Sequence, residues 1–421
     1  MTPSAPSVPS RVSHMAAGMT PSTILKMAAE VRALLAEGRQ VCNLTVGDFD
    51  PTYFPIPTGL RDGIETALKF GQTVYPPPMG VPSLREAIQI YSRVGLGLEY
   101  PVEGVLVTSG ARPAIYGAFR TLVDPGEGVI YSLPCWQYGN YCQLVGARPM
   151  PLSCDASTRF LPTRAMLEPM VRDARMLVLN SPNNPTGTMF EPDVLAGIAD
   201  LVLEENARRG QRERPLYLLY DQVYWTLTYG ETKHVTPVAL RPALAPYTVS
   251  VDAISKAFAA TGLRVGWALG PNDIIKAMGD YLADVGTWAP RPEQVATAMF
   301  LSASDAVAAY SRSIRSELKE RLDALHDGLR AIGIECSRPA GAIYLSARFA
   351  IPGRTNEEIR ATLLREADFA AVPFQGFGVA GDTGWFRLSV GAVTVTMIEG
   401  VLPKVAAAVE RLRREPVGAA V

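Results

Sequence analysis

The chain has 421 residues, 48% of them hydrophobic and 19% charged, and its 40 basic and 41 acidic side chains give a net charge of -1. This length predicts two or three domains of roughly 100–200 residues, and the balanced charge disfavours nucleic acid or an anionic membrane as a partner. The five cysteines and three histidines show no metal-ligand spacing, so we expect neither a metal site nor a disulfide framework. Because the sequence shows no membrane-span or signal-peptide pattern, we expect a cytoplasmic enzyme.

The N-terminal part combines helices with irregular segments. Residues 1–21 are rich in proline and serine and predict a flexible arm. Apolar residues at helical spacing predict a helix over 22–38, and a short strand follows over 41–46. Two more helices are predicted over 62–70 and 82–94, on either side of a proline-rich loop.

From residue 104 onward, short apolar segments alternate with helical ones. Strands are predicted over 105–108, 129–132, 176–180, 216–220, 248–251 and 265–269, with helices over 113–122, 192–206 and 273–285 between them. This alternation predicts an α/β fold with a mostly parallel sheet covered by helices on both faces. The candidate chemical residues come just after strand ends, where ligands bind in open α/β sheets.

The C-terminal part predicts a smaller α+β domain. A long helical region over 293–332, with a break near 303–305, precedes strands over 342–347 and 385–390 and helices over 355–367 and 396–414.

One lysine has the surroundings of a nucleophile. Lys256 follows an apolar strand-like run and lies among small residues, and Arg264 comes eight positions later. With few charges to solvate it, its ammonium form is disfavoured, which is the condition for an amine that forms a Schiff base with a carbonyl. A single lysine is far more often a surface residue, so the other motifs must decide.

Two motifs after strands suit a charged ligand. Gly110, Ala111 and Arg112 join a strand to a helix, where backbone N–H groups and the guanidinium favour an anion, although an ordinary turn fits as well. Asp221 follows a buried strand, where a carboxylate is costly unless it is paired. A protonated pyridine nitrogen would be such a partner, and a helix N-cap is the alternative.

Three further motifs suit a planar, acidic ligand. The loop Ser181–Gly187 contains two prolines and a glycine, which would aim the Asn184 amide at a phenolic oxygen. Arg387, on a predicted strand, would bind a substrate carboxylate with two hydrogen bonds, or else lie on an exposed face. Trp136 would stack on a planar ring, or else belong to the core.

Together these motifs resemble the class I/II aminotransferases of the fold-type I pyridoxal-phosphate enzymes, which are aspartate aminotransferase-like. The likeness runs from about Ser22 to the C-terminal helix. Its most specific parts are SPNNPTG at Ser181–Gly187, YDQVY at Tyr220–Tyr224 and SKAFAATGLRVG at Ser255–Gly266.

The resemblance implies a mostly parallel sheet of the seven-stranded type in a large cofactor domain. It also implies a division into the arm 1–21, a segment 22–60 that joins the small domain and covers the active site, a large pyridoxal-phosphate-binding domain 61–300 and a small domain 301–421.

The resemblance implies a role for each site residue. Lys256 would hold pyridoxal 5'-phosphate as a Schiff base and carry the proton between the substrate α-carbon and the cofactor. Asp221 would pair with the pyridinium nitrogen, and Tyr224 and Asn184 would bind the ring oxygen. The residues implied at the cofactor phosphate are Gly110, Ala111, Arg112, Ser255, Arg264 and Tyr75 of the neighbouring subunit. The remaining implied roles are ring stacking for Trp136 and substrate binding for Gly47, Asn184 and Arg387.

The implied activity is transfer of an amino group from an amino acid to a 2-oxo acid by a ping-pong mechanism, in a homodimer with shared active sites. Two alternatives keep the cofactor: a lyase or decarboxylase on the same fold, and a non-catalytic sensing regulator. The regulator would need a DNA-binding segment, and only about 21 residues precede the first predicted helix.

The substrate side chain is not determined by these motifs. Dicarboxylate-specific relatives use a second arginine from the partner subunit, and the corresponding region 281–290 contains none, although Arg291 follows directly. Phe49, Tyr53 and Phe54 would suit an apolar or aromatic amino acid, or would only pack their own loop. Ala253 stands where many relatives have Ser or Thr near the phosphate.

Overall fold

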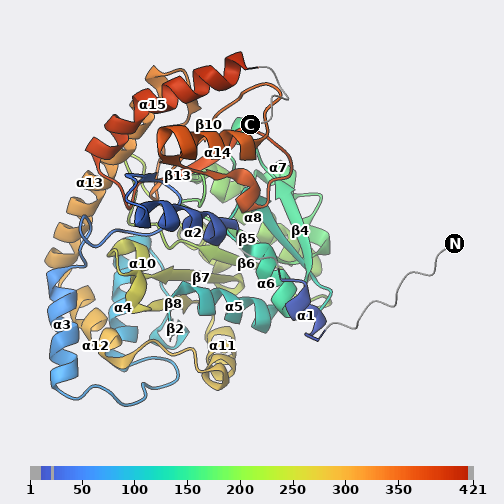
Figure 1. The fold of residues 1–421 in the computed structure, drawn as a ribbon. Coiled ribbons are helices and arrows are strands. Elements are labelled where there is room, and N and C mark those ends of the chain that lie inside the picture. Colours follow the sequence, from blue (N-terminus) through green and yellow to red (C-terminus); the bar gives the residue numbers. More distant parts are fainter. Residues whose placement is uncertain (1–10, 20–22, 416–421) are drawn as a thin grey trace.

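The computed structural model describes residues 11–19 and 23–415 (Figure 1). The predicted arm therefore lies partly outside the described residues. Its described part includes the short helix α1 (His14–Ala17), whose N-cap is Ser13. This helix contacts α6 (Tyr138–Val145), where the Gln143 side chain donates to the Met15 carbonyl oxygen at 3.2 Å.

A sheet of seven strands forms the centre of the larger part of the molecule (Figure 1). From edge to edge its strands are β2 (Val105–Thr108), β8 (Gly266–Leu269), β7 (Thr248–Ala253), β6 (Tyr217–Asp221), β5 (Ala174–Asn180), β3 (Gly128–Leu133) and β4 (Arg148–Ser153). The strands from β7 to β4 pair in parallel, and only β8 runs antiparallel to its two neighbours. The prediction of a mostly parallel sheet is confirmed.

Six of these strands were predicted close to their observed bounds, and β4 was missed. Its sequence contains Pro149 and Pro151, and its residues are exposed or half-buried. Proline is confined to edge strands because it cannot donate to the ladder. β4 is such an edge strand, so it lacks the apolar run that marks the buried strands.

Helices cover both faces of the large sheet, and two apolar cores result. The side chains of a strand alternate between faces, so Leu218 lies in the core with α4 (Pro82–Leu96), α8 (Pro192–Arg209) and α12 (Arg291–Ser302), and Leu219 lies in the other. That second core includes α5 (Ala111–Leu122), α6 and α11 (Asn272–Val285). Burial on both faces explains the nearly continuous apolar sequence of the central strands. Helix α3 (Thr58–Lys69) lies against α12.

A smaller antiparallel sheet and its helices form the second part. Its strands, in order, are β12 (Val372–Pro373), β13 (Trp385–Ser389), β10 (Tyr344–Arg348) and β9 (Glu335–Cys336). The helices of its core are α13 (Ser304–Ala331), α14 (Asn356–Ala367) and α15 (Val395–Arg414). The predicted break in the long helical region is confirmed, because α12 ends at Ser302 and α13 begins at Ser304.

The N-terminal segment lies against this second part. The strand predicted over 41–46 is only β1 (Cys42–Asn43), which pairs in parallel with β11 (Phe369–Ala370). Helix α2 (Thr23–Ala36) precedes it, and Figure 1 shows α2 beside the smaller sheet, above the large one. Two ion pairs, Arg39 with Asp368 and Glu30 with Arg360, tie the segment to α14 and the turn after it. The chain after β1 then meets the segment that follows β7, where the Gly47 carbonyl oxygen accepts a hydrogen bond from Lys256 Nζ.

Candidate active site

Three neighbouring strands of the large sheet end at the same edge with residues that face one cavity. Asn180 ends β5, Asp221 ends β6 and Ala253 ends β7, and the ladder pairs Asn180 with Asp221. All three line a cavity of about 390 Å³. The carboxyl edge of parallel strands is the usual ligand position in such sheets.

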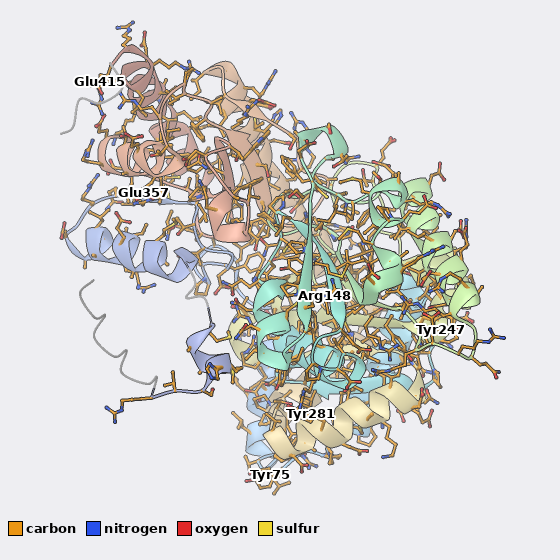
Figure 2. All side chains as sticks on the ribbon, turned by 90° about the vertical axis from the view of Figure 1, so that its right-hand side faces the viewer. Tyr75, Arg148, Tyr247, Tyr281, Glu357 and Glu415 are labelled. Carbon is orange, nitrogen blue, oxygen red and sulfur yellow. The ribbon has the colours of Figure 1, made fainter. Side chains whose placement is uncertain are left out.

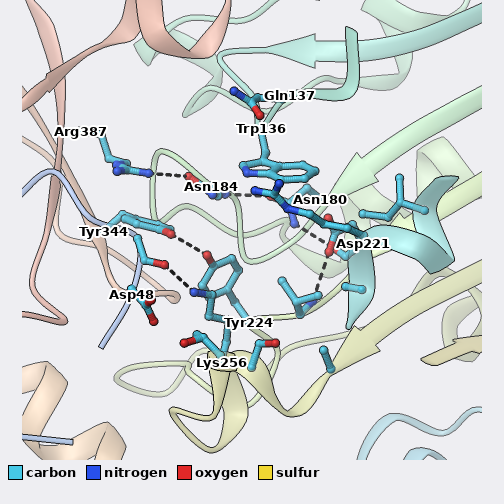
Figure 3. A pocket seen from close by; sticks show the side chains of 18 of the residues that line it. Asp48, Trp136, Gln137, Asn180, Asn184, Asp221, Tyr224, Lys256, Tyr344 and Arg387 are labelled. Atoms are coloured by element: carbon cyan, nitrogen blue, oxygen red, sulfur yellow. Dashed lines mark hydrogen bonds between the residues drawn. The ribbon is translucent and has the colours of Figure 1, made fainter. Parts of the chain in front are cut away.

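Most of the predicted site residues line this cavity (Figure 3). They are Gly47, Ala111, Arg112, Trp136, Asn184, Asp221, Tyr224, Ser255, Lys256, Arg264 and Arg387. Gly110 lies just outside, at the N-cap of α5. Tyr75 does not line the cavity of its own chain: its side chain is 82% exposed and packs edge-on against Trp288 at a centroid distance of 5.5 Å.

The Lys256 amine lies at the floor of the cavity. Its Nζ donates to the Gly47 carbonyl oxygen at 2.5 Å and lies 5.7 Å from the centre of the Phe49 ring. Burial lowers the pKa of Lys256 to about 8; the Asp48 carboxylate opposes this shift, and nearby arginines add to it. A lysine with such a pKa has a substantial free-amine fraction near neutral pH, so it can act as a nucleophile.

The Asp221 carboxyl group is almost completely buried. Its Oδ2 accepts a hydrogen bond from the Tyr138 hydroxyl at 2.7 Å, and its Oδ1 accepts one from the Val223 backbone N–H at 3.4 Å. Burial raises the pKa of Asp221 to about 6, although these two hydrogen bonds oppose the shift. A positively charged ligand group beside it would lower the pKa again, because it would favour the charged carboxylate.

Arg387 reaches the cavity from the smaller sheet. Its guanidinium lies between the rings of Tyr344 and Phe377, with 4.7 and 4.8 Å to their centres. It donates to Asn184 Oδ1 at 3.4 Å and to the Thr45 carbonyl oxygen, and its Nε has no hydrogen-bond partner among the described residues. No carboxylate pairs with it in the described part of the chain. A buried guanidinium of this kind favours an anionic ligand.

Positive charge also gathers at the start of α5. Gly110 has φ +86°, a conformation that favours glycine, and a Cβ there would lie 2.1 Å from an Arg264 nitrogen. Arg264 donates to the Ser109 and Thr261 carbonyl oxygens at 3.1 and 2.6 Å, and the Arg112 guanidinium lies 4.8 Å from the Trp136 ring centre. A helix N-terminus with two guanidinium groups suits an anion such as a phosphate.

Several cavity residues were missed from the sequence. Asn180 had a signal, since it is a polar residue at the end of a buried strand next to Asp221. Tyr344 had none: it comes from the other sheet, and its hydroxyl meets that of Tyr224 at 2.6 Å. Asp48 and Gln137 also line the cavity, and each directly follows a residue that was predicted.

The aromatic residues of the 48–57 loop were left open as substrate contacts. Phe49 and Phe54 pack edge-on against each other at 5.5 Å, and both belong to the core around the smaller sheet, against which Tyr53 also packs. None of the three lines the cavity. Packing of their own loop is thus the role that the contacts support.

Metal-binding and membrane-spanning features are absent from the described residues. Across 11–19 and 23–415, His, Cys, Asp and Glu side chains form no group of three or more that could hold a metal ion. Within the same ranges, no helix combines the length and apolar character that a bilayer crossing requires.

Comparison with known proteins defines the class. Residues 39–405 match the family model described as aminotransferase class I and II. The chain therefore belongs to the class I and II aminotransferase family and is an aminotransferase.

Several similar proteins within this class have aspartate aminotransferase in their names. An aspartate aminotransferase of Geobacillus stearothermophilus is 34% identical, over 87% of this chain and 92% of its own length. A probable aspartate/prephenate aminotransferase of Thermus aquaticus is 33% identical, over 88% of this chain and 93% of its own. A solved structure, aspartate aminotransferase from Thermus thermophilus with maleate, superimposes with a TM-score of 0.86 at 30% identity and covers 94% of this chain and 99% of that one.

We predict that Lys256 is unusually reactive in the ligand-free protein. An amine-acetylating reagent should label it with a pH midpoint of about 8, against about 10.4 for a lysine peptide in the same mixture. Mass spectrometry of the peptide containing Lys256 measures the midpoint. Asp48→Asn removes the anion that stabilises the ammonium form and should lower the midpoint further. A midpoint equal to that of the peptide would contradict the assignment.

Proposed function

We propose that this aminotransferase uses pyridoxal 5'-phosphate, held on Lys256, to move an amino group from an amino acid to a 2-oxo acid in two half-reactions. The observation that carries the proposal is that one cavity brings together three groups: the Lys256 amine with its lowered pKa, the buried Asp221 carboxyl group, and the Arg387 guanidinium, which has no carboxylate partner among the described residues. Members of this family use the same cofactor, which supports the proposal.

The donor set of the cavity fits that cofactor. Burial disfavours the charged form of the Asp221 carboxyl group. The pyridinium nitrogen would give this group a cationic partner. The phosphate would be held by Arg264, Arg112, Ser255 and the first N–H groups of α5. These groups offer positive charge and hydrogen-bond donors, which an anion needs.

The remaining ring contacts would come from three more side chains of the cavity. Trp136 would lie against the ring, and Tyr224 and Asn184 would contact its oxygen. No hydroxyl is available from Ala253, so the phosphate would have one contact fewer than in many members of the family.

The cofactor and the residues of the cavity would have separate roles in the reaction. When bound, the cofactor supplies a carbonyl for amine exchange and a ring that withdraws electrons from the substrate α-carbon. Lys256 Nζ would remove the proton from that carbon and deliver it to the cofactor. An amine can do this because its pKa lies near the operating pH. Arg387, with Asn184 and the Gly47 backbone, would hold the α-carboxylate so that this proton faces the amine.

The relatives suggest the first donor to test. One is named an aspartate aminotransferase and another a probable aspartate/prephenate aminotransferase, and a similar aspartate aminotransferase was solved with maleate, a dicarboxylate. Arg291 does not line the cavity of its own chain: it donates to Gln72 Oε1 at 2.9 Å and to the Tyr75 carbonyl oxygen at 3.2 Å. Its place beside Tyr75 means that it would approach the substrate only in a partner subunit's site.

A homodimer with shared sites forms part of the proposal. Figure 2 places Tyr75 at the outer edge of the larger part, at the end opposite Glu357 and Glu415. Three large apolar side chains that closely precede it in the chain are exposed as well: Leu68, Phe70 and Val74. An apolar group of this kind marks a protein interface, and a second copy would cover it and place Tyr75 near the partner's cavity. The cytoplasmic location and the domain boundaries stay predictions.

Addition of an amino donor alone tests the reaction class. With aspartate, and then with aromatic and aliphatic amino acids, we expect the visible absorbance of the bound cofactor to convert stoichiometrically to the pyridoxamine form, with no 2-oxo acceptor present. Lys256→Ala should remove this conversion. Release of ammonia or carbon dioxide by every amino acid tried, without that spectral change, would support the lyase or decarboxylase alternative instead.

Removal of the buried carboxyl group tests the proposed pairing. Asp221→Ala should retain bound cofactor, because the phosphate contacts remain, and should lower kcat by at least about 100-fold, because a charge interaction at the ring nitrogen is lost. Absorbance titration and steady-state kinetics measure the two effects. Rates within a few-fold of the wild type would contradict the pairing.

Mixed dimers test the shared site. Tyr75→Ala and Lys256→Ala subunits, unfolded together and refolded, should recover up to roughly a quarter of the wild-type activity, since half of a random mixture is heterodimer with one intact site. Separately refolded variants are the controls. If Tyr75 acted within its own subunit, the mixture would remain as inactive as its components.

A further inference from the structure

A second carboxyl group is buried beside the catalytic strand ends, and the proposed chemistry does not use it. Asp252 lies on β7, four residues before Lys256, and its side chain is 1% exposed. Because strand side chains alternate, it points to the opposite face of the sheet from Val251 and Ala253. It therefore points away from the cavity that Ala253 lines.

Asp252 makes two short hydrogen bonds. Its Oδ2 accepts the indole N–H of Trp225 at 2.7 Å, and its Oδ1 accepts the backbone N–H of Ala253 at 2.7 Å. Trp225 directly follows Tyr224, and its own backbone N–H donates to the Gln222 carbonyl oxygen at 2.9 Å. The side-chain bond thus joins the turn after β6 to the strand that leads into Lys256.

The Trp225 ring is held in a narrow space against α4. Its centre lies 5.2 Å from that of Tyr91, and a Cβ on Gly95 would come within 2.4 Å of the ring. The indole can therefore shift little without displacing the helix. A hydrogen bond from a ring fixed in this way restrains the position of its acceptor as well as its donor.

The state of Asp252 favours a geometric role. Burial raises the pKa of Asp252 to about 8, the hydrogen bonds from Ala253 and Trp225 oppose the shift, and the nearby Asp221 carboxyl adds to it. The charged form of the carboxyl group is therefore disfavoured. Each of its oxygens accepts a hydrogen bond from an N–H group, and these two hydrogen bonds are what the side chain contributes to the site.

We propose that Asp252 and Trp225 are a positioning pair. Their hydrogen bond fixes the position of the turn with Asp221 and Tyr224 relative to the turn with Lys256. The inference rests on the proposed function, in which those three side chains act on one ligand. Loss of this hydrogen bond would leave all three side chains present but displaced relative to one another. A displacement of about 1 Å is enough to reduce the rate of catalysis.

Two tryptophan substitutions form a matched test in the holoenzyme. Trp225→Phe removes the indole that donates to Asp252. Trp267→Phe makes the same change on the neighbouring strand, where Trp267 pairs with Asp252 in the ladder, is fully buried, and has an indole nitrogen without a hydrogen-bond partner in the described part of the chain. Trp225 is partly buried and packs against the same core. The control therefore loses at least as much packing as the test variant but loses no hydrogen bond.

We expect Trp225→Phe to lower kcat about tenfold with KM for the amino donor changed less than about twofold, since the substrate contacts remain. It should also shift the pH midpoint of the cofactor absorbance. Trp267→Phe should lower the unfolding temperature at least as much but leave kcat and that midpoint near the wild-type values. Asp252→Asn keeps an acceptor oxygen for the indole but turns its NH2 group toward the Ala253 N–H, so it should retain more of kcat than Asp252→Ala, which should behave like Trp225→Phe.

Equal losses in kcat for the two tryptophan variants would overturn the proposal, because they would reflect packing alone. Equal kcat in Asp252→Ala and the wild type would also overturn it. If Trp225→Phe did not fold, the comparison of Asp252→Asn with Asp252→Ala would decide. A failure of the proposed function is distinguishable, since the wild type itself would then show no absorbance change with any donor.

Discussion

The site depends on the exclusion of water from ionisable groups at one edge of the large sheet. Burial lowers the pKa of Lys256 and of Arg387 and raises the pKa of Asp221, and it is the largest cause in each case. All three shifts favour the neutral form of the group. The proposed ligand, with an anionic and a cationic group, would supply the charges that these side chains lack.

The two parts of the molecule contribute differently to this arrangement. The large sheet supplies the groups at strand ends, whose relative positions follow from the ladder between β5, β6 and β7. The smaller sheet supplies Arg387 and Tyr344 across its own antiparallel pair, β10 and β13. The segment with Gly47 runs between them: its carbonyl oxygen accepts from Lys256, and a side chain there would lie 2.6 Å from the Tyr344 hydroxyl. The cavity is therefore closed by contacts between segments that are distant in the sequence.

The sequence was informative where a residue and its structural reason lie close together in the chain. The strands around Asn180, Asp221 and Lys256 are apolar runs that end in polar residues, and the family motifs coincide with those ends. The contacts of Tyr138 with Asp221 and of Tyr344 with Tyr224 join residues 83 and 120 positions apart, and no local pattern encodes such a meeting. β4 was missed for a related reason: an edge strand needs no apolar run.

The antiparallel strand β8 has a consequence of another kind. Because β8 returns beside β7, with Ala253 opposite Gly266, the residues between them form one closed loop that carries both Lys256 and Arg264. The amine and the guanidinium therefore share one short loop that the sheet anchors at both ends, while Gly47 and Ser109 hold their side chains from outside the loop. A change in the number of residues in that loop would alter the separation of the two groups.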